Sequence, residues 1–409
     1  MRSIIPLAEH NPPSYEYRLC LRDRVICLRQ TSDALLYRSV FPGPSPDPDL
    51  EDQREAETLK WIHDYFQLKV DLSELYKQWG ARDAVFHSRK DRFSGIRMLR
   101  QDPFENLISF ICSSNNNIGR ITKMIQALCR HYSTTLVTLP PPADFSSTSG
   151  QPSGESHAYH PFPPPSVLAA PGVAGTLRTL GFGYRADFIQ KTAKMLVDTH
   201  GGTDRDALEP AERWLLTLRE KSTQEAREEL LKFMGVGRKV ADCILLMSLD
   251  KNEVIPVDTH VHQIAMKHYG VNGSSKAKTA MTPKLYDEVS NKLAIIWGSY
   301  AGWAHLVLFT SDLKSFASYG LPTPSPSPSV QVEVGRISRK RKVGLATLPT
   351  IPPPQTTSKS SRARAGASLR TDAEAGSTLP VYEESGLSMA DRVKRRRRAE
   401  KAINVAAAS

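Results

Sequence analysis

The chain has few cysteines, and those it has are far apart in the sequence. Five cysteines occur among 409 residues, with no close pair of the kind that zinc sites use and no group of four that would hold an iron–sulfur cluster. Their odd number and wide spacing also differ from a disulfide framework. We therefore expect an intracellular protein with no metal and no organic cofactor.

Long apolar runs are also missing from the sequence. No stretch approaches the ~20 apolar residues that span a bilayer. The opening residues, MRSIIPLAEHNPPSYEY, do not have the character of a signal or transit peptide. We accordingly expect no membrane partner.

Net charge is nearly absent from most of the chain and concentrated at its end. Residues 320–409 carry 16 Lys and Arg against 7 Asp and Glu, whereas residues 1–319 carry 38 against 36. The overall formal charge of +11 favours an acidic partner such as nucleic acid. In residues 1–319, such a site would depend on a few well-placed basic groups and backbone amides, while the last segment would add a non-specific attraction.

The C-terminal segment is rich in Pro and Ser and contains two basic clusters, SRKRKV at 338–343 and VKRRRR at 393–398. This composition predicts a disordered basic tail over residues 320–409. Clusters of this kind suit the nuclear import machinery, so we expect a nuclear protein; a solvated charge cluster is the alternative. A mitochondrial location stays open, because the N-terminus could hide a targeting signal.

The rest of the chain predicts a small sheet followed by many helices. Residues 16–40 alternate apolar and polar positions in two runs rich in β-forming residues, which is typical of strands. From residue 51 the period becomes helical. Amphipathic helices are predicted at 55–68, 102–114, 118–132, 184–200 and 223–234.

These patterns predict a mainly α protein with a small antiparallel sheet near its N-terminus. We place an α+β sheet domain at residues 1–95 and a helical domain at residues 96–319. Residues 140–165 are too rich in Pro, Ser and Gly to fold alone and are predicted to form a flexible insertion between helices.

The stretch FMGVGRKVADCILLMSLD, residues 233–250, has the pattern of two helices joined by a tight turn. Gly235 and Gly237 would let the chain reverse without Cβ clashes and expose backbone N–H groups at the start of the second helix, where a phosphate binds. Such a helix-hairpin-helix indicates sequence-independent contact with a DNA backbone. For the glycines alone, a plain turn is the commoner explanation, with Lys239 reaching from the helix end to water.

Asp258 stands 19 positions after Lys239, between a short apolar run and another helical pattern. An amine at the positive end of a helix dipole loses its proton more easily, so Lys239 is a candidate nucleophile. A carboxylate opposite it would stabilise positive charge on a sugar ring, and this pair suits cleavage of an N-glycosidic bond. Capping of the next helix is the ordinary alternative for Asp258, and it is compatible with catalysis.

Two further sets of residues recur at helical spacing. Lys239, Cys243 and Met247 are four residues apart and share one face of their helix, as do His305 and Phe309 in AGWAHLVLF. Core packing is the common role for Cys, Met and Phe at such spacing. Beside a reactive lysine, however, these side chains would wall a pocket for a base.

At this point the chain resembles a known family. The motifs QDPFENLISFICSSNNNIGRIT, LGFGYRADFI, MGVGRKVADCILLMSLDK with VIPVDTHVHQIA, and WGSYAGWAHLVLFTSDL are similar to those of eukaryotic 8-oxoguanine DNA glycosylase/AP lyases of the helix-hairpin-helix DNA glycosylase superfamily. The similarity covers about residues 17–316, apart from the proline-rich insertion. It implies the helix-hairpin-helix glycosylase fold, a monomer, and base excision repair.

The resemblance implies removal of 8-oxoguanine opposite cytosine from duplex DNA, after the base has been flipped out of the stack. Lys239 would attack the sugar and form a Schiff base, and β-elimination would then nick the strand. Asp258 would assist that step, and His260 would contact the DNA backbone near the flipped nucleotide.

Other positions acquire roles by the same resemblance. Phe309 would stack on the extruded base opposite Cys243, in a base pocket completed by the side chains of Met247 and His305.

Asn115, Arg120 and Arg185 would hold the orphaned cytosine, and Tyr184 would wedge into the opposite strand. Amide and guanidinium groups match a Watson–Crick edge, and an aromatic ring fills a stacking gap. Without the resemblance, a capping turn at 115–117 and an ordinary helix start at Tyr184 would be favoured.

Two features depart from the family pattern. His305 stands where the family commonly has a glutamine that reads the base, and a neutral imidazole replaces only part of an amide's hydrogen bonding. The family's GQ-F-W segment, whose glycine carbonyl recognises the oxidised base, has no counterpart at the start of this sequence. We therefore expect a truncated sheet domain with an exposed edge, and weak or poorly selective activity.

The alternatives are a related glycosylase for formamidopyrimidine lesions and a catalytically impaired DNA-binding remnant. Retention of Lys239 and Asp258 argues against the remnant.

Overall fold

The computed structural model describes residues 2–7, 14–43, 48–142, 155–202, 208–271 and 281–321. All of these residues lie in the first of the two units into which the chain divides, residues 1–328. The predicted basic tail lies outside the described residues except for its first two positions. Residues 143–154, in the middle of the predicted insertion, also lie outside the described residues.

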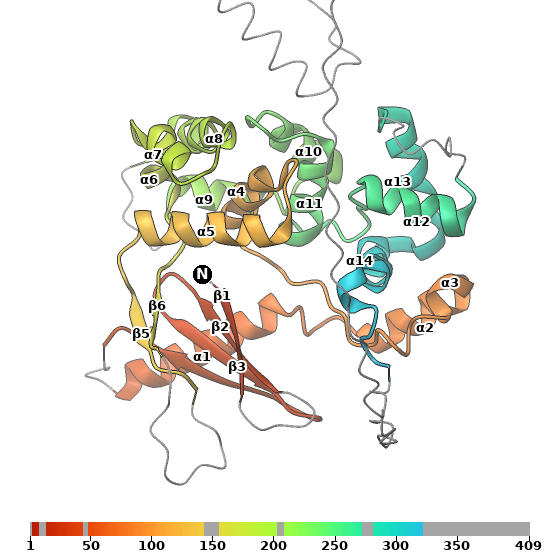
Figure 1. The fold of residues 1–409 in the computed structure, drawn as a ribbon, viewed down its shortest axis with the longest axis horizontal. Helices are drawn as coiled ribbons and strands as arrows, with labels where there is room; N and C mark the ends of the chain where they lie inside the picture. The colour runs from red at the N-terminus through yellow and green to blue at the C-terminus, as the bar shows by residue number, and fades with distance from the viewer. Residues whose placement is uncertain are drawn as a thin grey trace, which may run out of the picture. The chain divides into compact units, whose positions relative to one another are not determined.

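Four antiparallel strands form a meander at the start of the chain (Figure 1). They are β1 (Arg2–Pro6), β2 (Tyr15–Cys20), β3 (Val25–Gln30) and β4 (Leu35–Val40), in that spatial order. Ile26 and Leu28 of β3 pack against Ile62 of helix α1 (Pro48–Tyr65). The opposite face of β3 carries Val25 and Cys27, as expected from the alternation of side chains along a strand.

All five residues of β1 pair with β2, so the strand near residue 16 is an inner strand. The first strand in the sheet order, β1, is itself an edge strand, and its Ile4 is 65% exposed. Arg2 donates to the side-chain oxygen of Gln101 at 3.0 Å, and the Ser3 hydroxyl lies 2.7 Å from the Tyr159 hydroxyl. These contacts tie β1 to distant parts of the chain. The strand RSIIP has only two aliphatic residues, Ile4 and Ile5, which is too little pattern to identify it from sequence.

A second, two-stranded sheet brackets the proline-rich insertion. It consists of β5 (Val137–Leu139) and β6 (His157–Tyr159), paired antiparallel. Leu139 and Tyr159 are buried against the face of the first sheet that carries Val25 and Cys27. Residues 157–159 of the segment predicted to be flexible therefore form a strand, in which Tyr159 is buried against the first sheet.

The helices gather around two separate hydrophobic cores. The first core is built by α4 (Pro103–Ser113), α5 (Ile118–Tyr132), α6 (Pro165–Ala169), α7 (Val173–Thr179), α8 (Arg185–His200), α9 (Pro210–Thr217), α10 (Thr223–Leu231) and α11 (Arg238–Ser248). The second is built by α2 (Leu72–Arg82), α3 (Ala84–His87), α12 (Thr259–Tyr269), α13 (Pro283–Trp297) and α14 (Ala301–Asp312). The 3₁₀ turns η1 (Gly298–Tyr300) and η2 (Lys314–Phe316) flank α14. All five helices predicted from periodicity are present, so the mainly α fold class is confirmed.

Local sequence signals explain several helix starts. Asp102 accepts a hydrogen bond from the Glu105 N–H at 2.8 Å and is followed by a proline at the first helical position of α4. Ser222 and Glu225 form a capping box at the start of α10. Asn117 caps α5 by accepting from the Arg120 N–H at 3.0 Å, as the capping interpretation of the 115–117 turn expects.

Helix α11 and the extended segment after it belong to both cores. Val240 and Ile244 of α11 are buried in the first core, whereas Leu246 is buried in the second. Farther along, Val254 packs in the first core and Val257 in the second. The stretch that contains the candidate lysine and aspartate therefore runs along the junction between the two helical clusters.

The expectation that no stretch is apolar enough to span a bilayer does not hold by length and composition alone. Helices α13, η1 and α14 together form a 30-residue stretch, Pro283–Asp312, that meets both criteria. Gly298 interrupts it with a φ of +76°. Trp297, Trp303 and Leu308 on either side of this break are buried in the second core. Packing inside the protein thus accounts for the apolar character of the stretch.

Candidate active site

The turn between α10 and α11 depends on one glycine in particular. Gly235 has a φ of +84°, and a Cβ atom there would lie 2.6 Å from Cδ2 of Phe188 on α8. Both the backbone conformation and the close neighbour therefore exclude a side chain. The next residue, Val236, is buried in the first core and anchors the turn.

The steric reason expected for Gly237 is wrong. Its φ is −103°, and an added Cβ would meet nothing within 4 Å. Gly237 is instead the exposed N-cap of α11, and it provides no side-chain hydrogen bond to the helix. The first N–H groups of α11 therefore carry no side-chain cap, and no acidic residue stands in the first turn. Unfilled amides at the positive end of a helix form an anion site.

Lys239 is the second residue of α11 and is half-buried. Its Nζ lies 5.1 Å from the ring centroid of Phe110 on α4, so an aromatic face holds the ammonium end of the side chain. Cys243 follows one turn later and is buried. Burial raises the pKa of the Cys243 thiol to about 11, although the adjacent Lys239 acts in the opposite direction. Cys243 is therefore a neutral, apolar neighbour of the lysine at pH 7.

Asp258 ends the extended segment and begins α12. Its Oδ1 accepts hydrogen bonds from the N–H groups of His260 and Val261, both at 2.9 Å. The capping interpretation is therefore confirmed. The second carboxylate oxygen, Oδ2, accepts no hydrogen bond from any described part of the chain. The cap fixes the carboxyl group while leaving this oxygen for another partner.

Helix α14 brings His305 to the same region. Gly302 makes this possible: a Cβ there would lie 2.4 Å from Cδ1 of Leu246 and 2.5 Å from the carbonyl oxygen of Val254. The Gly302 N–H donates to the carbonyl of Asn252 at 2.9 Å. The backbone of α14 therefore packs directly against both α11 and the segment that leads to Asp258.

His305 is a buried histidine with unused hydrogen-bonding groups. Its side chain is 91% buried, and neither ring nitrogen has a hydrogen-bond partner of good geometry among the described residues. Burial lowers the pKa of His305 to about 4; Asp258 acts in the opposite direction, and Lys239 lowers the pKa further. Both residues of the candidate pair thus act electrostatically on His305. Its imidazole is neutral at pH 7.

Phe309 lies between two histidines. Its ring centroid is 5.8 Å from that of His305 and 5.0 Å from that of His260, the latter in an edge-to-face arrangement. His260 Nε2 is also 3.5 Å from Oδ2 of Asp312. Lys239, Cys243, Asp258, His260, His305 and Phe309 are thereby linked by successive contacts or electrostatic effects. Met247, which shares α11 with Lys239 and Cys243, is half-buried against the second core.

Asn115, Arg120, Tyr184 and Arg185 meet at a different place, where the α4–α5 turn faces the start of α8. Asn115 is exposed and has the left-handed φ of +48°. The Arg185 guanidinium donates to the carbonyls of Ser114 and Asn115, and the Tyr184 hydroxyl donates to the Ser114 carbonyl at 3.1 Å. Arg120 donates to the Gly181 carbonyl at 3.1 Å.

These four residues differ in exposure. Arg185 is 3% exposed and uses its guanidinium on the turn itself, whereas Asn115, Arg120 and Tyr184 remain at the surface. Arg185 therefore supports the turn that carries Asn115 in this structure.

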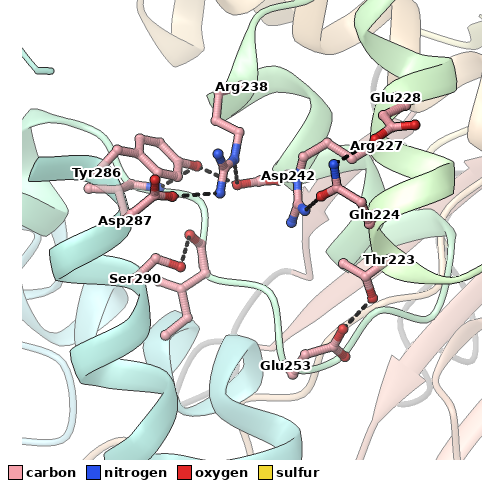
Figure 2. A network of polar contacts seen from close by, with 12 residues as sticks. Thr223, Gln224, Arg227, Glu228, Arg238, Asp242, Glu253, Tyr286, Asp287 and Ser290 are labelled. Carbon is pink, nitrogen blue, oxygen red and sulfur yellow. Dashed lines mark hydrogen bonds and ion pairs between the residues drawn. The ribbon is translucent and has the colours of Figure 1, made fainter. Parts of the chain in front are cut away.

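Sequence reasoning missed Asp242 and Tyr286. Asp242 is a carboxylate with 1% exposure on α11, next to Cys243, and it accepts hydrogen bonds from Arg227 and Tyr286 (Figure 2). The signal was a lone acidic residue inside the apolar run VADCILLM. A buried carboxylate requires partners, but the sequence did not indicate that they would come from α10 and α13.

A cavity of about 620 Å³ lies elsewhere in the molecule. It is bordered by residues 37–43 at the end of β4 and by Glu51, Arg54 and Glu55 of α1. It has no part in the lysine–aspartate site.

Comparison with known proteins agrees with this arrangement. Residues 8–107 match the family model described as "8-oxoguanine DNA glycosylase, N-terminal domain". Residues 108–286 match that of "HhH-GPD superfamily base excision DNA repair protein". The fold and the site thus define a DNA glycosylase of the helix-hairpin-helix class.

Two curated relatives are similar over much of their length. The N-glycosylase/DNA lyase of Saccharomyces cerevisiae is 33% identical over 304 residues, which are 71% of this chain and 74% of the yeast protein. The N-glycosylase/DNA lyase OGG1 of Arabidopsis thaliana is 39% identical over 254 residues, which are 62% of this chain and 61% of the plant protein. The chain belongs to the 8-oxoguanine DNA N-glycosylase/DNA lyase family.

Solved structures are similar as well. The 8-oxoguanine glycosylase/lyase of Clostridium acetobutylicum, in complex with double-stranded DNA containing cytosine opposite 8-oxoguanine, has a TM-score of 0.55 and 26% identity. The alignment covers 75% of this chain and 86% of that one. The same enzyme in its apo form has the same TM-score and identity.

Proposed function

We propose that this protein excises 8-oxoguanine paired with cytosine from duplex DNA and then nicks the strand through a Schiff base on Lys239. The observation that carries the proposal is the arrangement of three groups along the junction of the two helical clusters. Lys239 lies in the first turn of α11, Asp258 is the N-cap of α12, and both act electrostatically on the neutral His305.

In the proposed reaction, the unprotonated Lys239 amine attacks C1′ of the damaged nucleotide. The C1′–N9 bond breaks, and the base leaves with its bonding electrons and takes up a proton. The amine nitrogen loses its protons as the sugar ring opens to give a Schiff base. Removal of a C2′ proton then expels the 3′ phosphate by β-elimination.

Asp258 has a defined part in this scheme. Positive charge develops on the sugar as the base departs, and the free Oδ2 of Asp258 is available to stabilise it. Because Oδ1 is held by two backbone N–H groups, the carboxylate needs little reorganisation when the charge appears.

The extruded base would lie between the Phe309 ring and the neutral Cys243 thiol, with Met247 completing the apolar wall. His305 would offer one N–H donor and one nitrogen acceptor to the base edge, since neither ring nitrogen has a hydrogen bond of good geometry within the described chain. A buried polar group without a partner costs free energy that a ligand recovers. This is the strongest support for a base pocket at this place.

The remaining contacts would position the DNA. Unfilled amides after Gly235 and Gly237 at the start of α11 would bind a backbone phosphate, and His260 would contact the backbone near the flipped nucleotide. Asn115 and Arg120 would address the orphaned cytosine, Tyr184 would fill the stacking gap, and Arg185 would hold the turn that presents them.

The covalent intermediate between base excision and strand cleavage gives a direct test. Borohydride reduces a Schiff base to a stable covalent adduct, so the intact chain should be trapped on a duplex with 8-oxoguanine opposite cytosine. Lys239→Gln should abolish the adduct while leaving a cooperative thermal transition. Trapping that persists in Lys239→Gln would overturn the assignment of the nucleophile.

Undamaged duplex serves as the selectivity control. Its comparison with the damaged duplex tests selectivity, because the hydrogen on N7 distinguishes 8-oxoguanine from guanine. A formamidopyrimidine duplex tests the alternative substrate. No adduct on any duplex from a folded protein would favour the DNA-binding remnant.

We further propose that the basic clusters at 338–343 and 393–398 direct the protein to the nucleus. Residues 320–409 fused to a reporter should accumulate in nuclei. A diffuse signal, or a mitochondrial location of the whole chain, would contradict this.

A further inference from the structure

Asp242 is the centre of a polar network that joins three helices (Figure 2). Its Oδ1 accepts from Arg227 Nε of α10 at 2.7 Å, and its Oδ2 accepts from Arg238 Nε of its own helix at 3.2 Å. The Tyr286 hydroxyl of α13 donates to the same Oδ2 at 2.7 Å. Asp242 lies three residues after Lys239, so this network is attached to the helix turn that carries the proposed nucleophile.

Tyr286 extends the network to the other half of the candidate pair. Its hydroxyl accepts a hydrogen bond from the Val257 N–H at 3.1 Å, and Val257 immediately precedes Asp258. The tyrosine hydroxyl therefore accepts a hydrogen bond from the segment before Asp258 and donates one to helix α11. A single oxygen atom connects the backbone beside Asp258 with the side chain of a residue one turn from Lys239.

Several contacts hold Tyr286 in this position. The Arg238 guanidinium lies 4.9 Å from its ring centroid and donates to Asp287 on α13 at 3.0 Å. Tyr286 is 5% exposed, and burial, together with the nearby Asp242, raises its pKa above the usual range for a tyrosine. The hydroxyl therefore keeps its proton at any pH at which the enzyme would work, and it remains a donor to Asp242.

The segment before Asp258 is attached to neighbouring helices at two further points visible in Figure 2. Glu253 accepts a hydrogen bond from Thr223 of α10, and Ser290 of α13 lies 3.5 Å from the carbonyl oxygen of Ile255. Of these attachments, the hydrogen bond from Val257 to Tyr286 lies nearest to Asp258 in sequence. Tyr286 also reaches α11, through its hydrogen bond to Asp242. It is consequently the contact best suited to set the separation between the two ends of the site.

We propose that Tyr286 is a positioning residue that fixes Asp258 relative to Lys239 through its paired hydrogen bonds to Val257 and Asp242. This proposal rests on the proposed function of the pair. Removal of the hydroxyl leaves the Val257 N–H without its partner, so the segment shifts and the Asp258 carboxylate moves relative to the lysine. Catalytic groups tolerate such a displacement poorly.

Tyr286→Phe removes only the hydroxyl, and Tyr76→Phe is a matched control. The Tyr76 hydroxyl also donates to an oxygen, the Phe93 carbonyl at 2.9 Å, and also accepts a backbone N–H, that of Ile96 at 3.1 Å. Tyr76 is buried in the second core, like Tyr286. Each variant therefore loses one donated and one accepted hydrogen bond, to a carboxylate oxygen at Tyr286 and to a backbone carbonyl at Tyr76, but only Tyr286 is linked to the candidate site.

The experiment measures the single-turnover rate of excision on a duplex with 8-oxoguanine opposite cytosine. The Kd for a duplex with a non-cleavable tetrahydrofuran abasic site is measured in parallel. Thermal melts set a temperature at which each protein is fully folded. We expect Tyr286→Phe to slow the chemical step by about 10- to 100-fold, with a Kd within about twofold of wild type. Tyr76→Phe should leave both quantities close to wild type at a similar loss of melting temperature.

Two outcomes would overturn the proposal. Equal effects of the two variants on the rate would make Tyr286 a structural residue only, and a weakened Kd with an unchanged rate would make it part of DNA binding. Failure of the wild-type chain to excise or to form a lysine-dependent adduct is a distinguishable result. It would remove the proposed function and this inference together.

Discussion

Gly235 and Gly237 stand two residues apart in one turn, yet the structure predicts different results when each is changed to alanine. At Gly235 the φ of +84° costs an alanine about 1–2 kcal/mol. Its Cβ would lie 2.6 Å from the Phe188 ring, and relief of such overpacking costs about 1–3 kcal/mol more. We therefore expect Gly235→Ala to lower the free energy of unfolding by roughly 2–5 kcal/mol.

Gly237→Ala should behave in the opposite way. Its backbone conformation is ordinary and its Cβ would point into open space, so only the poorer capping by alanine remains, at about 0.5–1 kcal/mol. The added methyl group would instead stand at the exposed helix N-terminus, where we place a DNA phosphate. The loss should therefore appear in DNA affinity, as a rise in Kd of about tenfold, which corresponds to about 1.4 kcal/mol.

Urea unfolding followed by tryptophan fluorescence measures the first quantity, and fluorescence anisotropy with an abasic-analogue duplex measures the second. Both variants are compared with wild type at one fixed salt concentration, because phosphate contacts depend on salt. Equal losses of stability in the two variants would refute the steric account of Gly235. An unchanged Kd for Gly237→Ala would refute the phosphate site at the start of α11.

Three further predictions concern other parts of the molecule. Burial lowers the pKa of His305 to about 4, so the unfolded chain binds a proton there between about pH 6.5 and 4 while the folded chain does not. The free energy of unfolding should fall by up to about 3 kcal/mol over that window in wild type, but by less in His305→Gln. Urea unfolding of both proteins at pH 7 and pH 4.5 checks this. An identical pH dependence of the two proteins would contradict it. Arg185→Ala should lose the hydrogen bonds to the Ser114 and Asn115 carbonyls and lower the free energy of unfolding in urea by about 2–4 kcal/mol. It should also relax the preference for cytosine opposite the lesion. A variant as stable as wild type would count against a supporting role for Arg185. Ser3→Ala should remove the contact with the Tyr159 hydroxyl and cost about 1 kcal/mol in the same unfolding assay, whereas no change would show that β1 does not depend on it.

The sequence alone determined the features that depend on neighbours along the chain. The helix periods, the caps at Asp102 and Ser222, the turn at Gly235 and the helix starts at Lys239 and Asp258 all follow from local patterns, because capping and helical periodicity act over three or four residues. The same patterns, in order, carried the family resemblance. Strand β1 was not predicted because its five residues were too few to form a pattern.

Only the tertiary structure decided what lies next to what across long separations. Gly302 allows α14 to approach the segment before Asp258, which brings His305 within the electrostatic influence of Lys239 and Asp258 although the sequence separates them by up to 66 positions. Arg185, expected to face DNA, is buried because two carbonyls of a distant turn accept its hydrogen bonds. The partners of Asp242 come from α10 and α13 for the same reason: a buried charge is satisfied by whatever groups packing brings to it, and packing is a property of the whole chain.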